Sequence, residues 1–95
     1  MAVIGVLTME LRLEDSHSLK EKRHVVQSLK DRLRNKFNVA VAEIDHQDLW
    51  QRAAVAAVTV SSDHTHAQKV LQSVEDEAAA MLGGVLADAT VEWLA

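Results

Sequence analysis

The chain has 95 residues, of which 48% are apolar and 25% charged, with a formal net charge of −4 and no cysteine. We expect one domain over residues 1–95 with a two-layer core; the lack of cysteine excludes disulfides, thiolate nucleophiles and cysteine-ligated metals. No apolar run approaches the roughly 18 to 20 residues of a membrane span, and the first residues lack a secretory signal, so we expect a soluble cytoplasmic protein without membrane contact.

The first thirteen residues predict a strand. Apolar side chains occupy alternate positions, and Thr8, Glu10 and Arg12 lie between them, as in a strand with one buried face. Ile4 and Val6 interrupt the polar side near the start. We therefore expect that end of the second face to be apolar and available to another chain.

A helix of about five turns is predicted next. Ser18 followed by Glu21 matches a capping box, and apolar residues then recur at helical spacing. The apolar positions are Leu19, Val26, Leu29, Leu33 and Phe37. They occupy a narrow arc of the helix, which we expect to face a sheet.

Two further strands are predicted at residues 38–45 and 52–61, because both segments are rich in β-branched residues at strand length. The polar residues between them form a turn. Asp63 is expected to cap a second helix that Gly83 and Gly84 end.

Alternating apolar residues over 85–93 predict a final strand. The order is then β-α-β-β-α-β. This order is typical of the α+β ferredoxin-like sandwich, in which two helices cover one face of a four-stranded antiparallel sheet.

Several short motifs lie in and after the first predicted helix. They are Ser18-Leu19-Lys20-Glu21-Lys22-Arg23, Val25-Val26, Ser28-Leu29-Lys30, Phe37-Asn38-Val39, Glu43 and Asp48-Leu49-Trp50-Gln51-Arg52-Ala53. Together they resemble the YlxP-like family, small bacterial proteins with a domain of unknown function, over nearly the whole chain. The resemblance implies a ferredoxin-like fold and a cytoplasmic protein whose gene lies near genes for transcription, translation initiation and ribosome maturation. It implies no activity, ligand or cofactor.

Positive charge is concentrated in the first predicted helix. Residues 18–37 hold seven of the ten lysines and arginines and only two acidic residues, so this segment carries about +5 and the remainder about −9. Five polar residues within it follow one another at spacings of three and four. They are Lys20, Arg23, Gln27, Lys30 and Arg34. We call these five residues the stripe, which is about 20 Å long at helical rise.

The stripe has three interpretations. Its cations can neutralise phosphates along an RNA backbone, they can contact an acidic protein surface, or they can form an ordinary solvated helix face. The concentration of charge favours a binding surface over the solvated face.

Lys22 falls inside the apolar arc of the same helix, which is an uncommon place for an ammonium group. We expect its stem to be covered while its charged end reaches solvent past the sheet edge. An ion pair with Glu43 of the second strand is the less favoured arrangement. Lys22 is included among the candidate partner-binding cations.

The turn between the second and third strands provides two further candidates, Trp50 and Arg52, which can stack on a base or grip a partner. The favoured interpretation is different: Trp50 closes one end of the core, because tryptophan is usually well buried.

No catalytic or metal site is predicted. His64 and His66 lie two residues apart at a helix start, where their side chains diverge, and no other histidine has an evident catalytic partner. The chain has one Phe, two Trp and no Tyr, which disfavours base stacking on the sheet as in RNA-recognition motifs. A phosphate loop and a Cys-x-x-Cys loop are also absent from the sequence.

We therefore expect a non-enzymatic binding module without a cofactor or metal. The first hypothesis is an RNA- or ribosome-associated protein that docks through its basic first helix. The alternative is a protein-interaction module or homodimer that uses a sheet edge or the open sheet face and makes no nucleic acid contact.

Overall fold

The computed structural model describes all residues 1–95 and contains the four strands and two long helices that the sequence predicts. In chain order the elements are β1 (Val3–Arg12), α1 (Leu19–Lys36), β2 (Ala40–Asp45), β3 (Arg52–Ser61), α2 (His64–Leu82), the short 3₁₀ helix η1 (Gly83–Val85) and β4 (Leu86–Trp93). Neither long helix has the length and apolar character to cross a bilayer.

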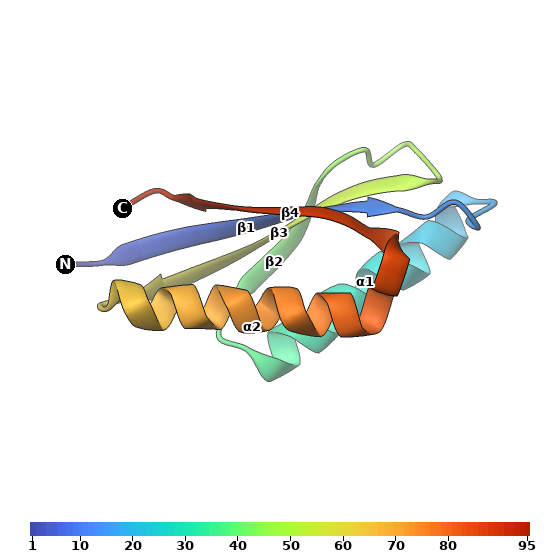
Figure 1. The fold of residues 1–95 in the computed structure, drawn as a ribbon. Coiled ribbons are helices and arrows are strands. Elements are labelled where there is room, and N and C mark those ends of the chain that lie inside the picture. Colours follow the sequence, from blue (N-terminus) through green and yellow to red (C-terminus); the bar gives the residue numbers. More distant parts are fainter.

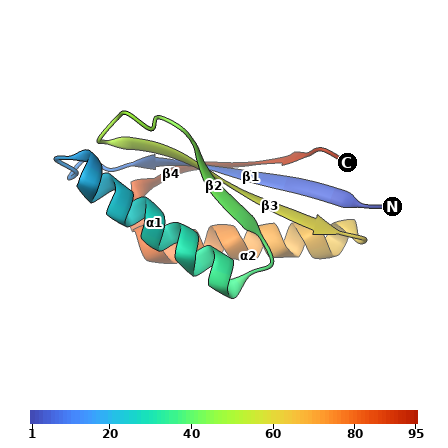
Figure 2. The ribbon, with the colours of Figure 1, turned by 180° about the vertical axis from the view of Figure 1, so that it is seen from behind.

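The four strands form one antiparallel sheet in the order β2-β3-β1-β4. Both helices lie against the same face of this sheet, and the opposite face carries no helix, although the connection between β2 and β3 rises on that side (Figures 1 and 2). The prediction of a ferredoxin-like sandwich is therefore confirmed. β2 and β4 are the two edge strands, and α1 lies on the β2 side of the molecule (Figure 2).

The core lies between the helices and the sheet. Odd-numbered residues of β1, including Leu7, Met9 and Leu11, are buried there against Leu29 of α1 and Leu71 of α2. Because side chains alternate along a strand, the even-numbered residues of β1 point to the open face. This alternation separates the residues that stabilise the fold from those left for a partner.

The capping signal of α1 works as expected, with one variation. The Glu21 N–H donates to Ser18 Oγ (3.1 Å), whereas the Glu21 carboxylate accepts from the N–H of His17 (2.7 Å), one residue before the cap. The helix ends where Phe37 becomes extended.

Two strands begin later than the sequence suggests. β2 starts at Ala40, and before it the Asn38 carbonyl accepts a hydrogen bond from Thr59 Oγ1 (3.2 Å) while the Val39 N–H donates to the carbonyl of Phe37 (3.0 Å). β4 starts at Leu86 because η1 extends the turn after α2, and Gly83 adopts a positive φ of 56° there.

Gly5 permits a close contact inside the sheet layer. A Cβ atom at this position would lie 2.6 Å from the Trp93 ring and 2.8 Å from Leu71. The indole of Trp93 therefore packs over β1 on the helix-covered side. By alternation the following residue, Leu94, points to the open face.

Candidate interaction surfaces on α1 and the β2–β3 hairpin

From Arg23 to Arg34 the stripe lies along the flank of α1 that borders the edge strand β2, whereas Lys20 at its start lines a depression with His24 and Val85. Arg34 fixes this orientation, because its Nη2 donates to the carbonyl oxygen of Val41 in β2 (2.8 Å). Arg23 and Lys30 share the flank through their helical spacing. Lys30 is half-buried, and the other stripe residues are exposed.

Three of the stripe cations have no polar partner within the chain. Lys20, Arg23 and Lys30 make neither a hydrogen bond nor an ion pair, whereas Gln27 donates to Asp31 (2.8 Å). Arg34 uses one donor on Val41 and keeps its charge, since a carbonyl does not neutralise a guanidinium. The stripe thus presents four cations that no carboxylate of the chain pairs.

The opposite flank of α1 behaves differently. Arg32 and Lys36 reach across to α2, where both contact the carboxylate of Glu77, at 3.2 Å and 2.5 Å. The hydrogen bond from Lys36, supported by the positive charge of both residues and opposed by partial burial, holds the pKa of Glu77 below its usual 4.5. These two cations serve the packing of the helices against each other.

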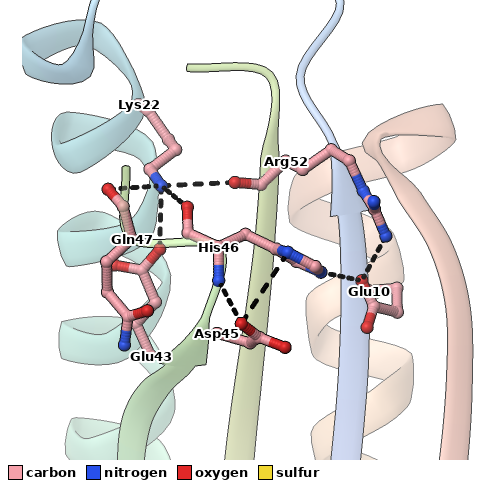
Figure 3. Close-up of polar contacts among 7 residues, drawn as sticks. All are labelled: Glu10, Lys22, Glu43, Asp45, His46, Gln47 and Arg52. Atoms are coloured by element: carbon pink, nitrogen blue, oxygen red, sulfur yellow. Dashed lines mark hydrogen bonds and ion pairs between the residues drawn. The ribbon is translucent and has the colours of Figure 1, made fainter. Parts of the chain in front are cut away.

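Lys22 does not reach solvent. Its side chain is only 1% exposed, and Nζ donates to the backbone carbonyls of His46 (2.7 Å), Gln47 (3.3 Å) and Arg52 (3.2 Å), as Figure 3 shows. The expectation of a solvated ammonium was therefore wrong, and Lys22 is removed from the partner-binding candidates. The three carbonyls replace the water that burial takes from the ammonium group.

The less favoured ion pair is present. Glu43 Oε2 lies 3.0 Å from Lys22 Nζ, and the Glu43 side chain is 17% exposed. This oxygen accepts no well-directed hydrogen bond, because the three protons of Nζ are directed to carbonyls. The pair is therefore an electrostatic contact that neutralises the buried charge.

The hairpin between β2 and β3 is held in place by further backbone contacts. The carbonyl of Gln51 accepts from the Leu13 N–H (2.9 Å), and its side-chain amide donates to the carbonyls of Glu14 (3.2 Å) and Ser16 (3.3 Å). His46 has a positive φ of 63°, an uncommon conformation for a residue other than glycine. α1 and the β1–α1 loop thus fix both ends of the hairpin.

The tip of this hairpin is apolar and exposed. Trp50 is 53% exposed and Leu49 is 46% exposed, so the interpretation of Trp50 as a residue that closes the core was wrong. The contacts of Lys22 and Gln51 hold the tip beyond the end of the core. An exposed indole on a fixed loop is a feature of interaction surfaces.

Arg52 lies at the base of the hairpin on the open sheet face. Its Nη2 is 3.8 Å from Glu10 Oε2, and the same oxygen lies 3.5 Å from Nε2 of His46 (Figure 3). Arg52 therefore shares a mixed-charge cluster with a carboxylate, and its side chain is not grouped with the stripe.

The remaining imidazoles form no convergent site. The His64 ring packs against Trp93, with ring centroids 4.2 Å apart, and no three metal-ligating side chains gather anywhere in the structure. An open depression of about 520 Å³ at the start of α1 is lined by Lys20, Glu21 and His24, among others. The Glu21 carboxylate there already accepts a hydrogen bond from the His17 N–H at the helix cap.

Comparison with known proteins places this arrangement in a family. Residues 4–91 match the family described as "Protein of unknown function (DUF503)". The chain belongs to that family. It is 43% identical over 72 residues to the uncharacterized protein YlxP of Bacillus subtilis (strain 168), an alignment that covers 76% of this chain and 78% of that protein. The YlxP-like resemblance is confirmed.

Solved structures support the fold of this DUF503 member. The de novo designed protein Foldit4 matches with a TM-score of 0.61 and 9% identity, over 100% of this chain and 98% of that one. A dimeric ferredoxin-like protein of unknown function from Thermobifida fusca YX matches with a TM-score of 0.51 and 17% identity, over 97% and 91% of the two chains. At these identities the likeness shows a shared ferredoxin-like fold.

Proposed function

We propose that this DUF503 protein is a non-catalytic module that binds structured RNA through the β2-side flank of α1. The RNA is expected to belong to a ribosomal particle or to one of its precursors. The observation that carries the proposal is that Lys20, Arg23 and Lys30 have no partner in the chain while Arg34 lies beside them. The same helix pairs the cations of its other flank internally.

The geometry of the flank suits a phosphate backbone. The cations recur every one to two helical turns on one side of a rigid 18-residue helix, so each can contact a different phosphate. No aromatic residue lies among them, which favours recognition of backbone shape over base identity. The strongly acidic remainder of the chain repels phosphate, so contact is confined to this flank.

The experiment measures binding of a structured RNA hairpin and of purified bacterial ribosomal subunits across a salt series. The test variant K20Q/R23Q/K30Q removes three charges from the stripe. If each cation neutralises a phosphate, the variant binds more weakly at every salt concentration. The log–log salt slope then falls by about 1 for each phosphate that is no longer neutralised.

A matched control removes the same charge elsewhere. R32Q/K36Q/K69Q takes two cations from the α2-side flank and one from α2, so its net charge equals that of the test variant. The control is expected to keep most of the affinity and the slope. If both triple variants lose the same amount of RNA affinity, net charge alone explains the loss. That outcome would reject the α1 flank as the docking surface.

A second candidate function is protein docking through the hairpin tip. It is favoured by the exposed Trp50 and Leu49, which lie on a loop that Lys22 holds in place. Acidic Asp45 and Asp48 lie beside this tip and disfavour phosphate there. The candidate predicts that ribosomal proteins stripped of RNA retain binding, and that W50A abolishes it while leaving hairpin RNA binding intact. Loss of all binding after ribonuclease treatment would reject it.

A further inference from the structure

The tip of the β2–β3 hairpin holds its apolar side chains in water. Trp50 is 53% exposed and Leu49 is 46% exposed. Lys22 binds three backbone carbonyls of the hairpin from the side of α1, and one of them, that of His46, also accepts the Leu49 N–H (3.0 Å). Because these contacts already fix the loop, a partner can bind the tip without first having to order it.

The hairpin also carries negative charge without a cation of its own. Residues 44–51 contain Asp45 and Asp48 but neither lysine nor arginine. The Asp45 side chain is 72% exposed. Asp48 is exposed, makes no hydrogen bond or ion pair in the chain, and lines the same open hollow of about 590 Å³ as Trp50 and Leu49. A carboxylate and an indole thus border one hollow.

The basic residues closest to the hairpin have carboxylates of their own. The Lys22 ammonium is buried and lies 3.0 Å from Glu43. Arg52 also lines the hollow, but its guanidinium is directed to Glu10 on β1 (3.8 Å), as Figure 3 shows. Each of these cations is therefore balanced by one acidic residue.

The β1–α1 loop beside the hairpin is balanced as well. The Glu14 carbonyl accepts a hydrogen bond from the Gln51 side chain (3.2 Å), which places this loop next to the tip. Glu14 and Asp15 are exposed there, and they share depressions with Arg12 and Lys20. The two negative charges of the hairpin itself are therefore in excess in this part of the molecule.

We propose that the hairpin tip binds a basic segment of another protein, with an arginine side chain seated in the hollow between Trp50 and Asp48. A guanidinium there is attracted by the π face of the indole and by the carboxylate together. Leu49 is available to an apolar residue of the same segment. An acidic segment or an RNA backbone would instead be repelled by the excess negative charge.

This inference rests on protein docking at the tip, the second candidate function, and adds the chemistry of the partner. It also agrees with RNA docking through α1. Lys22 joins α1 to the hairpin, so the start of the stripe and the tip lie at the same end of the molecule (Figure 2). Proteins that bind RNA carry lysine- and arginine-rich surfaces, and such a surface is suited to the acidic tip while the RNA itself contacts the stripe.

Backbone amide chemical shifts test the proposal. Isotopically labelled protein is titrated with an eight-residue peptide in which arginine alternates with glycine, and with the same peptide carrying glutamate in place of arginine. The arginine peptide is expected to shift residues 44–51 saturably, with an affinity that falls as salt is added, and the glutamate peptide is expected to leave them unchanged. Equal shifts with both peptides, or no shift of these residues with the arginine peptide, would overturn the proposal.

Matched double variants test the charge. D45N/D48N is expected to raise the Kd for the arginine peptide about three- to tenfold, because two exposed charge pairs are lost. The amide oxygen of asparagine can still accept the His46 N–H that Asp45 accepts (2.8 Å), so the loop should keep its shape. E75Q/D76N removes the same charge from α2 and is expected to keep the affinity. An unchanged Kd in D45N/D48N, or equal losses in the two double variants, would overturn the basic partner.

The indole is tested by W50L, which keeps an apolar side chain and removes the large π face. It is expected to raise the Kd for the arginine peptide about two- to fivefold. V60L is the control, since it changes an apolar residue of similar exposure outside the hairpin. Equal affinities of W50L and wild type would show that arginine does not stack on Trp50 and would overturn the proposed seat.

Failure of this inference can be told apart from failure of protein docking. If ribosomal proteins stripped of RNA bind through Trp50 while the arginine peptide leaves residues 44–51 unchanged, the tip docks a partner of other chemistry and only the basic assignment is rejected. If neither binds, protein docking at the tip is rejected as well. A hairpin RNA that shifts residues 44–51 as strongly as the arginine peptide would assign the tip to RNA and overturn the proposal.

Discussion

The two flanks of α1 carry similar charge and use it in opposite ways. On the α2 side, Arg32 and Lys36 converge on the single carboxylate of Glu77. On the β2 side, Arg23 and Lys30 extend from the helix without an ion-pair partner in the chain, and Lys20 at the helix start has none either. The difference shows that a basic helix is not a single surface: one flank is part of the fold, and the other is available to bind.

Between the flanks lies Lys22, whose removal is expected to have the largest effect on stability. K22M leaves three carbonyls of the hairpin and the Glu43 carboxylate without their cation, which should lower the free energy of unfolding by about 3–5 kcal/mol. Urea denaturation measures this loss. E43Q is the control and should cost less than K22M, because the ammonium loses its counter-charge but keeps its three carbonyl partners. A K22M variant as stable as wild type would show that the contacts of Lys22 with the hairpin carbonyls are not needed for folding.

The comparison between the flanks predicts a smaller difference in stability. R32Q and K36Q should each lower the free energy of unfolding by about 0.5 kcal/mol, since both are exposed members of an ion-pair network. K20Q and K30Q remove no polar contact within the chain and should leave the unfolding midpoint unchanged. Equal destabilisation by all four substitutions would remove the distinction between the flanks.

The smallest expected effect is a pH dependence at the α2 side. The pKa of Glu77 is lowered in the folded protein, so its contribution is fully present above the unfolded value near 4.5 and is lost as the pH falls through the folded value. The stability difference between wild type and E77Q should therefore shrink as the pH is lowered from about 6 to about 3. Denaturant midpoints at each pH test this. A constant difference over that range would mean that the carboxylate is not stabilised by its neighbours.

The sequence predicts most of the fold because its signals are local. Ser18 and Glu21 mark the start of α1, Asp63 and Gly83 mark the two ends of α2, and alternation marks the strands. The stripe follows from helical spacing alone. These features depend on residues a few positions apart, so their spacing along the chain is enough to detect them.

The hairpin could not be predicted in the same way, because its contacts join backbone atoms far apart in sequence. Lys22 binds carbonyls 24 to 30 residues away, and a carbonyl leaves no mark on the residue type. The exposure of Trp50 depends on the contacts of Lys22 and Gln51 that hold the hairpin, so the usual burial of tryptophan was a poor guide. Only the unusual position of Lys22 in the apolar arc signalled that a partner was required.

The two tryptophans lie in different surroundings, so their fluorescence reports on two different parts of the structure. Trp93 is packed over Gly5 and beside His64, so its fluorescence reports whether the sheet and α2 are assembled. Trp50 stands in water at the hairpin tip, and with no tyrosine in the chain its emission is free of that overlap. A W93F variant would leave Trp50 as the single reporter, whose spectrum would shift whenever a ligand covered the tip.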